Sequence, residues 1–337
     1  MIRFNCDYSE GAHEKIMERM MQTNMEQTPG YGEDYHCENA RALIRKACNA
    51  PEAEVHFLVG GTQANLTVIA SALRPHQAVV GAVTAHINVH ETGAIEATGH
   101  KVLALPSDNG KLTAKQIEEC CVYYSDEHMV QPKMVYISDS TEVGTIYTKA
   151  ELKELSAVCR KLNLYLFLDG ARLGYGLAAA DNDLTLADIA ELCDVFYIGG
   201  TKVGALFGEA VVITNPALKP DFRYYIKQKG GMLAKGRLLG IQFETLFEDN
   251  LYMEISNYAD RLADKLRKAF VKAGYSFCWE NQTNQIFPIM PDEKLAQLGE
   301  KYAFNYDHRV DETHSVVRFC TSWATKEEAV DSLIADL

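Results

Sequence analysis

The sequence predicts an α/β fold: a largely parallel central sheet with helices on both faces, followed by a small carboxyl-terminal α+β domain. Two observations support this prediction. Short apolar runs alternate with amphipathic helical patterns, and the pattern changes after about residue 245. A chain of 337 residues with 47% hydrophobic content can bury a substantial core. We therefore expect a large domain over residues 1–245 and a small domain over residues 246–337.

The individual elements follow from periodicity in the order of the chain. A first helix is expected at 12–25, where Ile16, Met17, Met20 and Met21 share one face. In the last part of the chain we expect a long polar helix at 253–273 and short strands at 285–290 and 315–320. Between these regions, helical segments separate most of the strands expected at 55–59, 78–83, 101–105, 133–138, 164–169, 194–199 and 209–213.

Two of these strands end abruptly in a reactive polar residue. Asp169 closes Leu-Phe-Leu-Asp, and Lys202 closes Tyr-Ile-Gly-Gly-Thr-Lys. Ligands of open α/β sheets bind beyond the carboxyl ends of the strands, so both groups are expected to face one bound molecule. Pyridoxal phosphate needs this pair, because a lysine forms a Schiff base with its aldehyde and a carboxylate keeps its ring nitrogen protonated. The simpler alternative is a surface lysine and an aspartate that caps the next helix.

A third segment suits the same cofactor. The strand at 55–59 runs into the turn Gly60-Gly61-Thr62, and a helix with apolar residues at helical spacing follows from Gln63 to Leu73. Free backbone N–H groups at such a helix start bind phosphate, and the Thr62 hydroxyl adds a donor. The turn matches neither a Walker loop nor a full dinucleotide fingerprint, and on its own it is compatible with plain chain reversal.

Several motifs together resemble the low-specificity threonine aldolase and β-eliminating lyase family of fold type I pyridoxal phosphate enzymes. They are Tyr31-Gly32-Glu33-Asp34, Gly61-Thr62-Gln63-Ala64-Asn65-Leu66, Asp169-Gly170-Ala171-Arg172 and Thr201-Lys202. The resemblance extends from Asp7 to the segment around Arg318, in matching order and spacing. It implies a fold type I architecture, with residues 1–245 as the cofactor-binding domain.

The resemblance also implies a role for each matching residue. Catalytic roles would fall to Lys202 as the cofactor lysine, Asp169 as the partner of the ring nitrogen, and His86, which would stack on the ring. Arginine suits a substrate carboxylate because its planar fork binds at two points and keeps its charge. The alternative role for Arg318 is a salt bridge beside the strand expected at 315–320. The cofactor would contact Lys202, Gly61, Thr62, His86, Asp169, Arg172 and Thr201, and the substrate carboxylate would contact Arg172 and Arg318.

The implied reaction is the cleavage of L-threonine, L-allo-threonine or a related β-hydroxy-α-amino acid to glycine and an aldehyde. A base must take the β-hydroxyl proton, and the candidates are His86, His90 or a water held by either, since histidine titrates near neutral pH. A β-eliminating lyase or an aminotransferase acting on a small amino acid is the nearest alternative.

Three departures from the family pattern concern substrate handling. A family histidine is replaced by Glu142 in Asp139-Ser140-Thr141-Glu142-Val143-Gly144, and a raised pKa would let this glutamate transfer protons. A family arginine is replaced by Leu233 in the segment 230–235, where Lys229, Lys235 or Arg237 are possible sources of the missing charge. Cys6 stands where the family has a serine.

Composition restricts partners and location. The net charge of −13 argues against nucleic acid and anionic membranes. Nine scattered cysteines without a Cys-x-x-Cys pair argue against a disulfide framework, and no leader or membrane-spanning run is evident, so we expect a cytoplasmic protein. By resemblance, the protein would be a homodimer or homotetramer with active sites at the subunit interface, to which Tyr31 to Asp34 would contribute.

Two rival hypotheses come from other classes of protein. His86 and His90 are four residues apart, with Glu91 adjacent and His100 further on, which is a spacing that can bind zinc. The His-Glu-x-x-His order is absent, however, and no third ligand is obvious, so we do not predict a bound metal ion. The other rival is a chain that binds the cofactor without catalysis and acts as an interaction partner, which the changes at Glu142 and Leu233 keep open.

Overall fold

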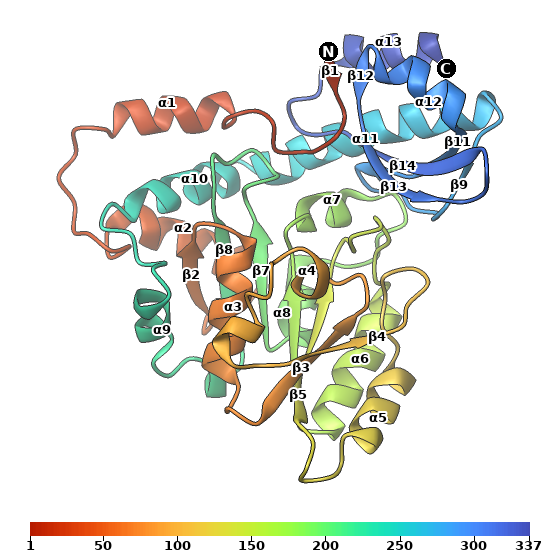
Figure 1. Ribbon diagram of the computed structural model, residues 1–337. Helices are drawn as coiled ribbons and strands as arrows, with labels where there is room; N and C mark the ends of the chain where they lie inside the picture. The colour runs from red at the N-terminus through yellow and green to blue at the C-terminus, as the bar shows by residue number, and fades with distance from the viewer.

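A computed structural model describes the whole chain, residues 1–337. Its centre is a seven-stranded sheet with helices on both faces (Figure 1). The strands are β2 (Glu54–Leu58), β3 (Gln77–Ala82), β4 (Val102–Leu105), β5 (Gln131–Ser138), β6 (Tyr165–Asp169), β7 (Val195–Gly199) and β8 (Glu209–Ile213). All seven lie within two residues of the strands predicted from the sequence, and their spatial order is β2-β8-β7-β6-β5-β3-β4.

The prediction of a largely parallel sheet is confirmed. Pairings β3 with β4, β3 with β5, β5 with β6 and β6 with β7 are parallel, whereas β8 runs antiparallel to both of its neighbours, β2 and β7. Every residue of β3, β7 and β8 is buried, which explains their continuous apolar sequences, because a sheet covered on both faces leaves no polar side.

The helices of this part pack in groups around the sheet. Helix α6 contacts both α5 and α8, and these three helices pack on β6, β5 and β7 respectively, whereas α2 packs on α10 near β2. Helix α1 stands apart and packs on α10 (Figure 1). The helices are α1 (Glu14–Gln22), α2 (Tyr35–Ala47), α3 (Gly61–Ala72), α4 (His86–Val89), α5 (Ala114–Tyr123), α6 (Lys149–Lys161), α7 (Leu173–Ala178), α8 (Leu186–Leu192), α9 (Phe222–Gln228) and α10 (Arg237–Glu248), with 3-10 turns at Glu96–Thr98 and Pro216–Leu218.

The first helix is shorter than the predicted 12–25. The His13 side chain accepts a hydrogen bond from the Lys15 backbone N–H and so caps the helix start. At the other end, the Thr23 hydroxyl donates to the Arg19 carbonyl, and the helix ends there. All four residues of the predicted apolar face, Ile16, Met17, Met20 and Met21, nevertheless lie within the helix.

The last part of the chain forms an antiparallel sheet with three helices. The predicted helix at 253–273 is α11 (Leu251–Lys272) and the strand at 315–320 is β14 (His314–Cys320). The strand predicted at 285–290 is divided at Phe287, because Pro288 has no N–H for the ladder. The remaining elements are β9 (Ser276–Phe277), β10 (Gln285–Ile286), β11 (Pro288–Pro291), β12 (Tyr302–Ala303), β13 (Asn305–Arg309), α12 (Asp292–Gly299) and α13 (Glu327–Asp336).

Two separate hydrophobic clusters form the core. The larger one surrounds the seven-stranded sheet and reaches along the chain to Ala259, and the smaller one packs α11 against the carboxyl-terminal sheet. The chain start joins the smaller cluster, because β1 (Ile2–Arg3) pairs with β12 and Phe4 is fully buried there. The boundary at residue 245 stays a prediction.

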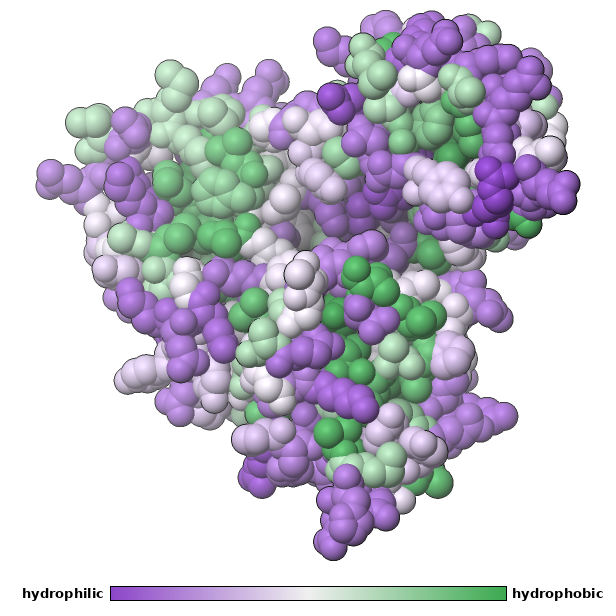
Figure 2. All heavy atoms as spheres, viewed as in Figure 1, coloured by the Kyte–Doolittle hydropathy of each residue, from purple (hydrophilic) through white to green (hydrophobic).

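Apolar residues also reach the surface. Figure 2 shows them gathered at the upper left, where Figure 1 places α1, α2 and α10. Met17, Met21 and Met25 near α1 and Tyr35 at the start of α2 are exposed. None of the helices combines the length and apolar character needed to cross a bilayer.

Candidate active site

One cavity of about 800 Å³ lies at the carboxyl ends of the parallel strands. A volume of this size is typical of sites for small ligands. Asp169 is the last residue of β6, Lys202 follows β7, and Val59 and Gly60 connect β2 to α3, which begins at Gly61. The cavity brings together all the site residues predicted from the sequence, which are Gly61, Thr62, His86, Glu142, Asp169, Arg172, Thr201, Lys202 and Arg318.

Asp169 is buried and held by several donors. One carboxylate oxygen, Oδ2, accepts hydrogen bonds from the Tyr136 hydroxyl and from Asn65 Nδ2 at 3.1 Å. The other, Oδ1, accepts the Ala171 backbone N–H at 3.0 Å. The carboxylate therefore has a fixed orientation at the cavity wall, where it can accept one further hydrogen bond from a protonated ring nitrogen.

The Lys202 amine has no hydrogen-bond partner, and no carboxylate oxygen lies within 4.0 Å of it. Burial lowers the pKa of Lys202, and the nearby Arg172 charge lowers it further, against the opposing charges of Asp7, Asp169 and Glu209. The backbone beneath it is fixed, because the Tyr175 hydroxyl donates to the Lys202 carbonyl at 2.6 Å. A lowered pKa favours the neutral amine, which is the nucleophilic form.

The turn between β2 and α3 provides an uncapped helix start. Helix α3 begins at Gly61, and no side chain caps its first N–H groups. A Cβ added at Gly60 would meet no atom within 4 Å, so the space beside the turn is open. These features suit a phosphate. Thr62 lines this end of the cavity, whereas the Thr201 hydroxyl already donates to Glu209 at 2.8 Å.

His86 is the first residue of α4 and is half-buried at the cavity wall. Its Nδ1 lies 2.7 Å from Glu91 Oε1. The His90 ring lies next to it, with 5.5 Å between ring centroids. Burial lowers the pKa of His90, and the charges of His86, Arg318, Lys202 and Arg172 lower it further, which favours the neutral ring. Both predicted base candidates thus face the same cavity.

Glu142 contacts the backbone of His86. Its Oε1 accepts the His86 backbone N–H at 2.9 Å and the Ser138 hydroxyl at 2.7 Å. Burial raises the pKa of Glu142, and the Asp169 charge adds to this. The requirement stated from the sequence, a glutamate whose pKa is raised by burial, is therefore met by this environment.

The two arginines differ in their environment. Arg172 is buried and bidentate with Asp7, at 2.7 Å from Nε to Oδ2 and 3.0 Å from Nη2 to Oδ1, so its charge is already paired. Arg318 donates to the Gln285 side-chain oxygen at 3.3 Å and the Asn5 carbonyl at 3.2 Å, and it has no acidic partner. Of the two, Arg318 is the one with an uncompensated charge toward the cavity.

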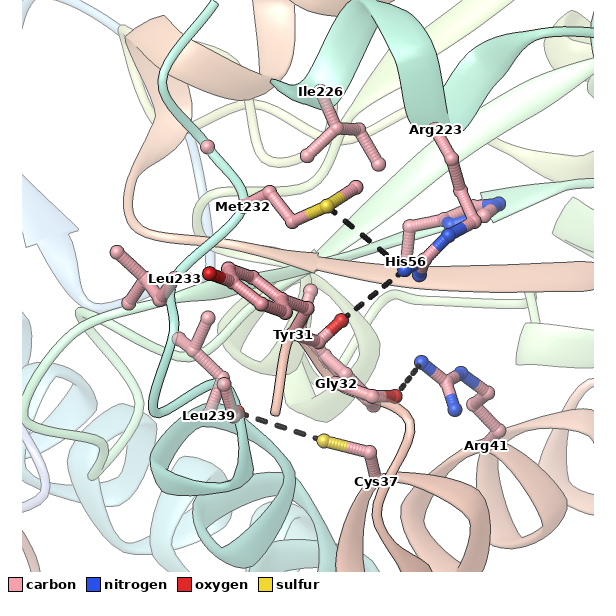
Figure 3. Close-up of a pocket in the computed structure, with 13 residues that line it drawn as sticks. Tyr31, Gly32, Cys37, Arg41, His56, Arg223, Ile226, Met232, Leu233 and Leu239 are labelled. Carbon is pink, nitrogen blue, oxygen red and sulfur yellow. Dashed lines mark hydrogen bonds between the residues drawn. The ribbon is translucent and has the colours of Figure 1, made fainter. Parts of the chain in front are cut away.

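The Tyr31 to Asp34 segment lies elsewhere in this chain. Tyr31 and Gly32 line a small pocket of about 30 Å³ with Leu233, room for little more than water (Figure 3). Arg223 reaches over this pocket to the Tyr31 carbonyl at 3.3 Å. The guanidinium of Arg237 donates to the carbonyls of Asn24 and Glu26 instead of facing the large cavity.

Several residues of the site network were missed by the sequence analysis. Asp7 and Asn65 had a signal only as residues within the family resemblance, which gave neither of them a role, and Tyr136 looked like an ordinary residue of a strand. For the zinc hypothesis, no group of three or more His, Cys, Asp or Glu side chains is arranged to hold a metal ion. His100 instead contacts the Gln77 carbonyl at 3.1 Å. Cys6 lies near Ser9 at 3.1 Å and outside the cavity lining.

The residues present fit pyridoxal phosphate. The cavity combines an unpartnered lysine amine, a fixed buried carboxylate, an uncapped helix start with open space beside it, and a free arginine charge. Lys202 would hold its aldehyde carbon, Asp169 its ring nitrogen, and Gly61 and Thr62 its phosphate.

Comparison with known proteins gives a consistent result. The family model described as beta-eliminating lyase matches residues 4–293. A low specificity L-threonine aldolase of Pseudomonas sp. is 32% identical over 99% of this chain and 96% of that protein. The structure of Leishmania major threonine aldolase is 48% identical, with a TM-score of 0.98 over 99% of this chain and 98% of that one. An aspartate aminotransferase of Thermus thermophilus, at 15% identity and a TM-score of 0.74 over 100% of this chain and 90% of that one, shares the fold.

Proposed function

We propose, because the chain belongs to the beta-eliminating lyase family, that it is a pyridoxal phosphate dependent aldolase that cleaves L-threonine and L-allo-threonine to glycine and acetaldehyde. One observation carries the proposal: an unpartnered lysine amine and a fixed carboxylate face the same cavity from adjacent strands of a parallel sheet. The named activities of the Pseudomonas and Leishmania relatives support the choice of substrate.

The protein's own residues would divide the work of the reaction. Arg318 would bind the substrate carboxylate at two points, and this grip would orient the bond between Cα and Cβ. When bound, the cofactor supplies an electron-accepting ring for the carbanion left at Cα. Asp169 would keep the ring nitrogen protonated, His86 would pack on the ring face, and His86, His90 or Glu142 would take the β-hydroxyl proton.

The alternative reactions of this family depend on which bond at Cα is oriented for cleavage. A β-eliminating lyase or an aminotransferase would use Lys202 and Asp169 in the same way. The aldolase is favoured because three proton-accepting side chains, His86, His90 and Glu142, line the cavity, and cleavage of a β-hydroxy amino acid requires one to take the hydroxyl proton.

We further propose that the enzyme acts in the cytoplasm as a homodimer or homotetramer, with residues 1–245 as the cofactor-binding domain and 246–337 as a small domain that brings Arg318 to the site. The exposed Met17, Met21 and Tyr35 support coverage by a second copy, since monomers rarely gather so many large apolar side chains. The Tyr31 to Asp34 segment, remote from its own cavity, would contribute to the site of a neighbouring copy.

The test supplies purified enzyme separately with L-threonine, L-allo-threonine, phenylserine and serine, and assays aldehyde, glycine, pyruvate and ammonia. Aldehyde with glycine supports the aldolase, whereas pyruvate with ammonia supports elimination. Borohydride should link the cofactor to Lys202. Lys202→Ala should lose the visible absorption band and turnover, while Lys153→Ala, at an exposed position of α6, should keep both. Turnover and cofactor attachment that survive in Lys202→Ala would refute the assignment.

A further inference from the structure

Behind His86 lies a buried pair of polar residues to which the proposed reaction assigns no role. Glu91 Oε1 lies 2.7 Å from His86 Nδ1 and also 2.7 Å from Asn65 Nδ2. The same Asn65 nitrogen lies 3.1 Å from Asp169 Oδ2. The Glu91 side chain and all of Asn65 are inaccessible to solvent. A continuous chain of hydrogen bonds thus joins the His86 side chain to the Asp169 carboxylate.

The chemistry of the acceptors fixes the orientation of Asn65. Both hydrogen-bond partners of the Asn65 amide are carboxylate oxygens, so the amide must present its NH₂ group, with one hydrogen for Glu91 and one for Asp169. The opposite orientation would place the amide oxygen against two acceptors. Asn65 Oδ1 and Glu91 Oε2 remain buried without hydrogen-bond partners, which costs folding free energy.

The same reasoning fixes the protonation of His86. Since Glu91 Oε1 is an acceptor, the hydrogen of the neutral imidazole lies on Nδ1, and Nε2 carries the lone pair. The His86 backbone is held separately, because Glu142 accepts its N–H at 2.9 Å. Both the position and the tautomer of the ring are therefore set by acidic residues that flank it.

We propose that Glu91, oriented by Asn65, is a positioning residue that keeps His86 in the Nδ1–H tautomer, with its ring fixed at the cofactor face and its Nε2 lone pair available to accept a proton. The tautomer assignment stands on the hydrogen bonds alone. Only its effect on catalysis rests on the proposed function. A carboxylate that orients a catalytic histidine in this way is worth large factors in rate elsewhere.

The first test needs no substrate. In protein labelled on the histidine nitrogens, the imidazole chemical shifts of His86, assigned by comparison with His86→Asn, should show a protonated Nδ1 and an unprotonated Nε2 in the neutral form. A neutral His86 protonated on Nε2, or an equal mixture of tautomers, would overturn the proposal. Because the tautomer is measured in the wild-type protein, it decides the proposal even where the Glu91 variants fail to fold.

The second test measures the effect on function. Glu91→Leu should give mixed tautomers and lower kcat/KM by about 100-fold, while the visible cofactor band persists through Lys202 and Asp169. In Glu91→Gln, the amide oxygen can still accept the Nδ1 hydrogen, so at least tenfold of the loss should be recovered. The control is Glu96→Gln, an exposed position nearby that should match wild type.

The outcomes separate the two proposals. A wild-type enzyme that binds no cofactor or cleaves no substrate contradicts the proposed function, and the tautomer measurement still stands. A fully active enzyme in which Glu91→Leu keeps one tautomer, or keeps kcat/KM within twofold of Glu96→Gln, contradicts the positioning role alone.

Discussion

Replacement of Asp7 by asparagine should destabilise the protein strongly. Asp7 is fully buried and forms two hydrogen bonds with Arg172 and one, at 2.9 Å, with Asn284 Nδ2. It therefore ties the chain start to α7 and to the carboxyl-terminal sheet. Burial alone would raise the pKa of Asp7, but the charges of Arg172 and Lys202, with these hydrogen bonds, hold it at about 2.

The magnitude follows from this pKa. A carboxyl whose pKa falls from 3.8 to about 2 on folding stabilises the folded state by about 2 kcal/mol at neutral pH. In Asp7→Asn this contribution is lost, and Arg172 is left as a buried charge without its partner, which brings the total loss to about 3 kcal/mol. Because the folded pKa is the lower one, the wild-type advantage is present above pH 3.8 and disappears as the pH falls through about 2.

Urea unfolding followed by circular dichroism at neutral pH measures the loss, and Asp108→Asn, an exposed aspartate, is the matched control. The variant midpoint should fall well below that of the control. Repeating the comparison at decreasing pH should bring the two curves together progressively as the pH falls from 3.8 through about 2. Equal midpoints for Asp7→Asn and Asp108→Asn at neutral pH would refute the view that the Asp7–Arg172 pair stabilises the fold.

Two further predictions concern the site. Arg318→Leu should raise KM for L-threonine roughly 100-fold, through loss of charge-assisted hydrogen bonds to the substrate carboxylate, with a much smaller change in kcat. Arg309→Leu, on neighbouring β13, should leave KM unchanged, and an unchanged KM in Arg318→Leu would exclude that role. Glu142→Gln should lower kcat by about 100-fold while the cofactor band persists, because the amide cannot take a proton. Its control is Glu154→Gln on α6, and a Glu142→Gln enzyme with full kcat would remove Glu142 from proton transfer.

The strand ends could be predicted from the sequence because their signal is local. An apolar run that stops at a charged residue identifies both the strand and the edge at which Asp169 and Lys202 meet, since parallel strands present the same ends together. The order and spacing of the motifs also indicated the family. The sequence also indicated the long helix and the short strands of the carboxyl-terminal part, but it missed the break before Pro288, a single residue without an N–H.

The supporting residues could not be predicted, because their roles arise from contacts between distant segments. Asn65 is separated by 104 positions from Asp169, and Asp7 by 165 from Arg172. A lone asparagine in an apolar helix carries no periodic signal. Similarly, β1 has only two residues, and its pairing with β12 places the chain start in the smaller core cluster. No local sequence pattern predicts this pairing.

The pairing of charges in the cavity explains how a site lined by several carboxyl groups could bind an anionic ligand. Asp7 pairs with Arg172, so Arg318 is the cation left to meet a carboxylate, while a phosphate would meet the uncapped start of α3. Burial raises the pKa of Glu142 and that of Glu209, and the Asp169 charge adds to both, so the cavity opposes the ionised form of each glutamate. Asp169 stays oriented by its donors to meet a protonated ring nitrogen. Burial of these two glutamates in the cavity wall therefore lowers the repulsion that an anionic ligand would meet there.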